Sequence, residues 1–424
     1  MNKPKNKINS HYVPVQTLKR FGERLCLFNV KTGEYFENVK LKRAFSRKGF
    51  YSSEIEEELN YKIENQFGAL FANKLANCEN TVELSREELR IVKKFLLISV
   101  VRSMGSEEYL EKEKHYYEDL EKSWLLFAKQ KGISDEDAVK NAPKAPFIEE
   151  QIDGETPFDY WMRTLNVILE SDGSPESIEK IPNKTYPAYR WAEVINNGYL
   201  AFWDSDYLSS EFVITDVGMT SENEKGWNGI NNHNRKKIDF MNGLLSAEKD
   251  ERMKIEIYKC MYLQRCFSEN FMMFPISAKR MIVEISPFYK FRKYYSYRYV
   301  MPRLEELTEM VNEDLFSPND CIYVKPQTEA GPVYHEDDRY IYKIKKLTKD
   351  ETIYCNELFL DRINTHVGFS SLGKVAGSIL RYKKRNSLPF VPRVDYTKLY
   401  DLINERFQAN IDTSTIAKPL KENG

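Results

Sequence analysis

The sequence predicts an α+β fold: a helical N-terminal layer, a central and mostly antiparallel sheet, and a closing C-terminal helical region. Two observations support this prediction. Apolar residues recur at helical spacing between residues 53 and 100, whereas short runs of β-branched and aromatic residues follow between residues 199 and 344. No internal repeat with a period of about 20 to 50 residues is present, which argues against a solenoid.

The first elements are short. Pro14 holds the residue before it in an extended conformation, and residues 15–21 then form a short helix that Gly22 closes. Two apolar runs, residues 25–30 and 35–39, flank a Lys-Thr-Gly-Glu loop. Because glycine adopts a positive φ without strain, this pattern predicts a β-hairpin.

Four helices are expected next. Apolar residues at helical spacing predict a long amphipathic helix over residues 53–75. Residues 85–88 have the form of a capping box and open a second, buried helix that ends at Arg102. A charged third helix over residues 106–132 is read as a solvated face, and a fourth begins at Thr156 after a proline-containing linker.

The second half of the chain is read as strands with intervening helices. Strands are predicted at residues 199–203, 211–215, 271–274, 281–285, 321–324 and 340–344. Helices are predicted at residues 246–267 and 303–312, and a final helical region at residues 356–384.

Composition excludes several classes of protein. The 63 basic and 64 acidic side chains balance, and 42% hydrophobic residues are too many for a disordered chain. No stretch approaches the ~18 uncharged apolar residues of a spanning helix, and no apolar segment follows the basic start. We therefore expect a cytoplasmic protein with no membrane association. Six cysteines without Cys-x-x-Cys spacing indicate buried free thiols rather than a zinc site or a disulfide framework.

Two residues suggest acid–base chemistry. His11 belongs to a rigid segment before proline, and Asp216 follows a predicted strand, so the two are candidates for a general acid and base. The structural alternative is that His11 binds a backbone carbonyl and that Asp216 caps a turn or the next helix.

Metal and cofactor sites are weakly indicated. Asp216 and Glu284 each lie on a predicted strand and could form part of a metal-dependent nuclease site, but Ser286 stands where the expected lysine would be. His335 lies beside three acids, a pattern that is common on loops. Phosphate-binding glycine loops and the nucleophile-elbow motif are absent from the sequence. We assign no metal ligand and leave the cofactor open.

The distribution of charge is more informative than its sum. No acid occurs between Ile285 and Leu304, and cations alternate there with aromatic residues, among them Lys290, Arg292, Lys293 and Tyr295. Cations for phosphates and flat rings for bases favour a surface for single-stranded nucleic acid over residues 287–303. A second acid-free run covers residues 362–394. Alternatively, the tyrosines pack a strand, or bind a protein partner, and the cations pair with the acids of residues 107–121.

Short motifs spread along the chain resemble a family of uncharacterised bacterial proteins of unknown function. They are the leader His11-Tyr12-Val13-Pro14 with Leu18 and Phe21, Arg102 at a helix end, Ile214-Thr215-Asp216, Phe274-Pro275-Ile276-Ser277, and Ile363-Asn364, taken as part of a late helix. Val217-Gly218-Met219 departs from the Asn-Pro-Val that the family shows after the aspartate. The resemblance implies a bacterial accessory or defence protein.

Because His11 and Asn364 belong to this one ordered pattern, we predict a single composite domain over residues 1–424. Its sub-regions are a mainly helical part with the hairpin, residues 1–172, and a mixed part, residues 185–395.

Three functional hypotheses follow. The first is a nucleic-acid-directed, nuclease-like or toxin-like effector with His11, Asp216 and Asn364 near the site and Arg102 as a phosphate or carboxylate clamp. The second is an enzyme acting on a nucleotide or another small anionic substrate. The third is a non-catalytic protein-interaction or regulatory protein.

Overall fold

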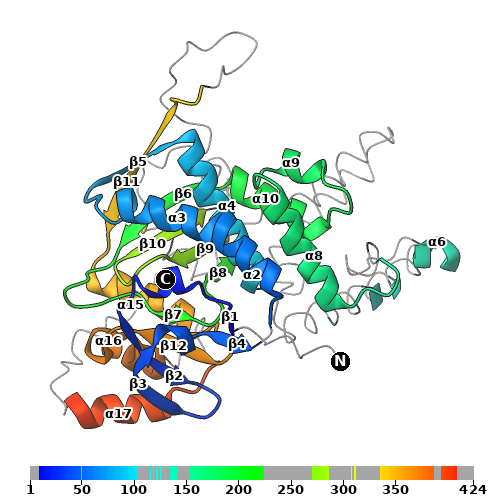
Figure 1. Cartoon of the computed structure of the whole chain (residues 1–424). Helices are drawn as coiled ribbons and strands as arrows, with labels where there is room; N and C mark the ends of the chain where they lie inside the picture. The colour runs from blue at the N-terminus through cyan, green and yellow to red at the C-terminus, as the bar shows by residue number, and fades with distance from the viewer. Residues whose placement is uncertain are drawn as a thin grey trace, which may run out of the picture. The chain divides into compact units, whose positions relative to one another are not determined.

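The computed structural model (Figure 1) describes residues 9–48, 50–103, 134–140, 152–223, 270–285, 335–385 and 393–407, with isolated residues between 115 and 129 and at 150, 307, 310 and 311. The chain divides into two compact units, each described here by itself. Unit 1 comprises residues 1–52, 68–86 and 197–424, and unit 2 comprises residues 53–67 and 87–196. The single composite domain stays a prediction.

Unit 1 contains a six-stranded sheet. Its strands lie in the order β5 (Thr81–Ser85), β11 (Arg339–Lys346), β6 (Tyr199–Asp204), β10 (Arg280–Ile285), β9 (Asn270–Pro275) and β8 (Thr220–Asn223). Only the pairing of β11 with β6 is parallel among these strands. The predicted mostly antiparallel sheet and the α+β class are thus confirmed, although β5 was not expected.

A second sheet of unit 1 has four strands in the order β3 (Glu34–Lys40), β2 (Arg24–Asn29), β12 (His366–Phe369) and β7 (Ile214–Thr215). The predicted hairpin is confirmed as β2 and β3, and Gly33 in its turn has φ 69°. The predicted strand at 211–215 is shorter than expected. In place of ladder bonds, the Phe212 N–H donates to the Ala278 carbonyl and the Val213 N–H to the Asn356 side chain.

The predicted helical region over residues 356–384 is confirmed, but a strand that was not expected interrupts it. Helix α15 (Lys349–Leu360) ends before β12, and α16 (Leu372–Lys384) begins after it. Val367 and Phe369 alternate with Gly368 and join the core on one face of the sheet. On the other face a Cβ at Gly368 would lie 3.0 Å from the Phe45 ring and 3.1 Å from Leu27. This close approach of neighbouring side chains requires glycine in the strand.

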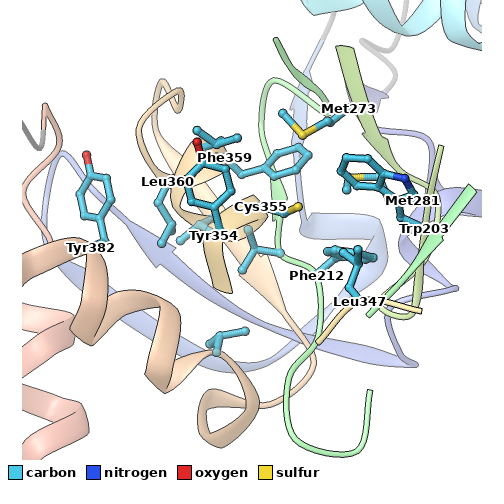
Figure 2. Packing of buried hydrophobic residues seen from close by; sticks show 14 of the residues in the cluster. Trp203, Phe212, Met273, Met281, Leu347, Tyr354, Cys355, Phe359, Leu360 and Tyr382 are labelled. Carbon is cyan, nitrogen blue, oxygen red and sulfur yellow. The ribbon is translucent and has the colours of Figure 1, made fainter. Parts of the chain in front are cut away.

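Two hydrophobic cores hold unit 1 together. The larger packs β2, β12 and the six-stranded sheet against α15, α16 and α17 (Thr397–Phe407), and Figure 2 shows Phe359 and Cys355 of α15 beside Met273 and Trp203. The smaller core packs β2 and β7 against α1 (Val15–Leu18) and η1 (Leu41–Arg43). A short pair, β1 (Asn9–His11) with β4 (Ser46–Lys48), completes this side.

Unit 2 is helical. Its helices are α2 (Ser53–Leu59), η2 (Asn60–Glu64), the start of α3 (Asn65–Leu70), α4 (Arg86–Ser103) from Glu87 onward, α6 (Asp135–Lys140), α8 (Pro157–Glu170), α9 (Pro175–Glu179) and α10 (Tyr186–Asn197). The first three, with η3 (Phe71–Leu75), form the continuous helical stretch predicted over residues 53–75. Phe67 and Phe95 stack with ring centroids 3.8 Å apart. Thr156 and Asp159 form the capping box that starts α8.

Buried charges of the six-stranded sheet are paired across strands. Asp204 is fully buried, and Arg280 on the neighbouring strand binds both of its oxygens, with Nε–Oδ1 at 2.6 Å and Nη2–Oδ2 at 2.9 Å. Lys346 adds a contact of 2.8 Å from β11. Arg280 also donates to the carbonyls of Leu75 and Cys78. These contacts fix the end of η3 (Phe71–Leu75) and the turn after it to the sheet.

The remaining predicted elements fall largely or wholly outside the described residues. They are the helices at 106–132, 246–267 and 303–312 and the strand at 321–324. Among the described residues, no helix combines the length and apolar character needed to cross a membrane.

Candidate functional site

Asp216 lies directly after β7 and binds the loop that enters β12. Its carboxylate accepts hydrogen bonds from the N–H groups of Asn364 at 3.1 Å and His366 at 3.3 Å. The Asp216 N–H in turn donates to the His366 carbonyl at 3.0 Å. Asp216 therefore meets Asn364 through the main chain of that residue. Asn364 lies in this loop and not in a helix, which corrects the sequence reading, because α15 has already ended at Leu360.

Burial dominates the electrostatics of Asp216. Desolvation raises the pKa of its carboxyl to about 6, although main-chain N–H groups from residues 364–366 favour the charged form. The carboxyl therefore exchanges its proton close to neutral pH. Burial also lowers the pKa of His366, so its imidazole is neutral at pH 7.

The N-terminal leader reaches Asp216 through Tyr12. The Tyr12 N–H donates to the Phe45 carbonyl at 3.2 Å, which fixes the leader beside β4. Burial, and then the negative charge of Asp216, raise the pKa of the Tyr12 hydroxyl well above its usual value, while Arg47 opposes this rise. His11, which precedes Tyr12, is half-buried and lies opposite Ser46 in the β1–β4 pair. Tyr12 is thus acted on by the Asp216 carboxyl and the Arg47 guanidinium, and His366 joins the site through its main-chain bonds to Asp216.

Three of these groups, Tyr12, Arg47 and His366, were not predicted. Tyr12 lies inside the leader motif itself, and His366 follows Asn364 by two residues. Arg47 belongs to residues 38–53, an acid-free run with five cations. This run has the composition that was noticed at residues 287–303, so the same criterion could have found it.

Arg102 belongs to unit 2 and has a buried acidic partner. Its Nη2 lies 2.7 Å from Oε1 of Glu64, and both side chains are almost fully buried. The preceding carbonyl, that of Val101, accepts from the Trp161 indole at 2.7 Å. These contacts support a structural role, and the ligand-clamp role stays a prediction.

The predicted nucleic-acid surface is only partly described. Lys290, Arg292, Lys293 and Tyr295 lie outside the described residues. In the second acid-free run, Arg381 and Arg385 pair with the buried Glu357. Arg393 pairs with Asp361, and Lys383 with Asp395. These four cations therefore have acidic partners within the described residues.

The metal hypotheses gain no support from the geometry. Asp216 follows a strand of the four-stranded sheet, whereas Glu284 lies buried on β10 of the six-stranded sheet. Oδ2 of Asp338, in the His335 turn, accepts the His335 N–H at 2.9 Å and pairs with Arg86. Within the described part of the chain, no group of three or more His, Cys, Asp or Glu side chains could hold a metal ion.

The fold and the site thus define a mixed α/β protein with a half-buried polar cluster at the junction of its N-terminal leader and its four-stranded sheet. The chain belongs to the family described as Protein of unknown function (DUF4238), whose model matches residues 9–317. The expected uncharacterised family is thereby confirmed. The match includes Tyr12, Arg47 and Asp216 and ends before the loop at residues 364–366. Comparisons with curated proteins and with solved structures gave no match.

Proposed function

We propose that this protein is a nucleic-acid-directed effector of the nuclease-like or toxin-like kind, with an accessory or defence role in bacteria, and that Asp216 is its acid–base group. One observation carries the proposal. The charge of Asp216, whose pKa is about 6, raises the pKa of the Tyr12 hydroxyl, and the positive charge of Arg47 lowers it. An anionic substrate would find a proton acceptor and a cation together at this place.

The chemistry that fits these groups is phosphodiester cleavage. Asp216 removes the proton from an attacking hydroxyl, whose oxygen forms the new bond to phosphorus. Tyr12, which the raised pKa keeps protonated, gives a proton to the departing oxygen as the old bond breaks. Arg47 offsets the negative charge of the phosphate. His11 flanks Tyr12, and Asn364 orients the carboxylate through its main-chain N–H.

Two alternatives use the same geometry differently. An enzyme acting on a nucleotide or another small anionic substrate would employ the same groups. A non-catalytic interaction or regulatory protein is favoured by two observations: the carboxylate of Asp216 already accepts main-chain N–H groups, and Leu208 is 93% exposed. In that case Asp216 only fixes the loop, and Leu208 contacts a protein partner.

The test is cleavage of labelled single-stranded RNA and DNA, with and without divalent cations. Asp216→Asn and Tyr12→Phe should each reduce the rate by about 10²–10⁴-fold. Tyr12→Phe leaves the bonds between Asp216 and its loop intact, so it separates chemistry from folding. Asp401→Asn, an exposed control on α17, should keep the full rate. Absence of cleavage, or equal rates in all variants, contradicts the proposal.

A further inference from the structure

The loop that binds Asp216 has a second buried carboxylate at its start. Asp361 directly follows α15, and the chain reaches Asn364 three residues later. Three residues span at most about 11 Å, so Asp361 lies close to the N–H group that Asp216 accepts from Asn364. The loop is therefore bounded by one buried carboxylate at each end.

Asp361 fixes the segment that leads into α17. Its Oδ1 accepts the Tyr382 hydroxyl at 2.8 Å, and its Oδ2 lies 3.6 Å from Nε of Arg393. The Tyr382 hydroxyl in turn accepts the N–H groups of Arg393 at 3.1 Å and Val394 at 3.2 Å. These bonds set the position of Tyr396, which directly precedes α17.

Tyr396 binds back to the start of the loop. Its side chain is fully buried, and its ring centroid lies 5.8 Å from that of Phe28 and 5.4 Å from that of Tyr382. Its hydroxyl donates to the Leu360 carbonyl at 3.0 Å. Leu360 ends α15, and the last carbonyls of a helix lack partners within the helix. Phenylalanine would fill nearly the same space, so this bond is what the hydroxyl adds.

Asp216 lies among groups that are uncharged at pH 7. Burial raises the pKa of the Tyr396 hydroxyl well above its usual value, and the charge of Asp216 adds to this rise. Tyr12 has a raised pKa from the leader side, and burial lowers the pKa of His366. Among the described residues, no cation forms an ion pair with the Asp216 carboxylate. The access of water therefore governs how tightly Asp216 holds its proton.

We infer that Tyr396 is a positioning residue for the candidate site: its bond to Leu360 holds residues 361–366 against Asp216 and keeps water from the carboxyl. Without this bond the loop loosens, so the carboxyl gains water and loses its main-chain N–H partners. Burial raises the pKa of Asp216 by more than the N–H groups lower it, so the net result is a lower pKa. The inference deepens the proposed function, but only its effect on cleavage rests on that function.

The test is Tyr396→Phe, which keeps the ring and removes the hydroxyl. Carbon-13 NMR of labelled aspartate side chains gives the titration midpoint of Asp216, whose signal is the one missing from Asp216→Asn. This midpoint should fall from about 6 toward the ordinary 3.8, by about one pH unit or more. Hydrogen exchange of the Asn364 and His366 N–H groups should become at least about tenfold faster.

The matched control is Tyr400→Phe, the same substitution one helical turn later. Within the described part of the chain, the Tyr400 hydroxyl forms no hydrogen bond. Both readouts should therefore equal those of the unsubstituted chain. If Tyr396→Phe changes neither readout beyond this control, or if the midpoint rises, the inference is overturned.

Two further measurements decide the remaining cases. Should Tyr396→Phe fail to fold, Tyr382→Phe takes its place, because it removes the acceptor of the Arg393 and Val394 N–H groups; it should move both readouts in the same directions, and unchanged readouts overturn the inference. In cleavage assays, the acidic limb of the pH–rate profile should move with the midpoint. If both readouts change but the unsubstituted chain cleaves nothing, the role of Tyr396 stands and the proposed reaction fails. If the chain cleaves but Tyr396→Phe changes neither readout, the proposed reaction stands and this inference fails.

Discussion

Asp216 and His366 exchange two hydrogen bonds: the Asp216 N–H donates to the His366 carbonyl, and the Asp216 carboxylate accepts the His366 N–H. This reciprocal pair joins residues 150 positions apart. It extends the β7–β12 pairing by one residue and holds a carboxyl group where water has little access. The contact therefore fixes the loop, and its N–H lowers the pKa of the acid against the larger rise that burial causes.

The raised pKa of Asp216 predicts a pH dependence of stability. The folded chain binds this proton more tightly than the unfolded chain, with a pKa of about 6 against an ordinary 3.8. Stability from this group is therefore present below about pH 4 and is lost as the pH rises through 6, by about 3 kcal/mol in total. Urea unfolding at stepped pH should show this fall relative to Asp216→Asn. A stability difference that stays constant from pH 4 to 7 contradicts the prediction.

Arg280→Met should destabilise unit 1 by about 3–5 kcal/mol, because it leaves the buried Asp204 short of its bidentate partner. It also leaves the carbonyls of Leu75 and Cys78 without this donor. Lys346→Met is the matched control: its side chain is 51% exposed, so its loss should cost about 1 kcal/mol or less. Chemical denaturation measures both costs, and equal costs would contradict the larger role that we assign to Arg280.

Arg102→Met tests whether this residue is structural. Removing the guanidinium leaves Glu64 buried without its cation, so we expect a loss of about 3–5 kcal/mol. The double variant Arg102→Met/Glu64→Met should regain most of this loss, since no buried charge remains. If the single variant unfolds at the same denaturant concentration as the unsubstituted chain, Arg102 does not contribute to stability, which contradicts the structural role.

Gly368→Ala should cost about 1–3 kcal/mol, because the new methyl group meets Phe45 and Leu27 within the sheet. Gly373→Ala in α16 provides the comparison. Its Cβ would lie 3.6 Å from the nearest atom, an ordinary contact, and alanine stabilises a helix by about 0.5 kcal/mol relative to glycine. Thermal unfolding should move in opposite directions for the two variants. A shared direction would mean that Phe45 moves aside without cost.

Local patterns predicted most elements that are described. Periodicity or turn residues within a short segment were enough to predict them. These elements are the hairpin, the helical stretch over residues 53–75, the start of α8, and strands β6, β9, β10 and β11. β12 was missed because its four residues follow a long helix and contain glycine. Its strand character comes from Phe28 and Thr215 on the neighbouring strands, which are distant in sequence.

Only part of the candidate site was predicted, because only part of it depends on local sequence features. Asp216 was recognised because it ends a strand, which is a local feature. Tyr12 and His366 become relevant only when the four-stranded sheet brings residues 12, 216 and 366 together. The ion pair of Arg102 could not be predicted from local sequence either, since Glu64 belongs to a different helix.

In both sheets, an inner strand is supplied late in the chain. β11 separates β5 from β6, and β12 separates β2 from β7. During synthesis, the earlier strands must therefore wait with unpaired edges until residues 339–346 and then 366–369 emerge from the ribosome. A nascent chain that stops before residue 339 can still pair β6 with β10 and β10 with β9. It exposes the strand edges that β11 and β12 cover in the complete sheets, and such edges pair readily with other chains. We therefore expect a chain truncated before residue 339 to aggregate more readily than the whole chain.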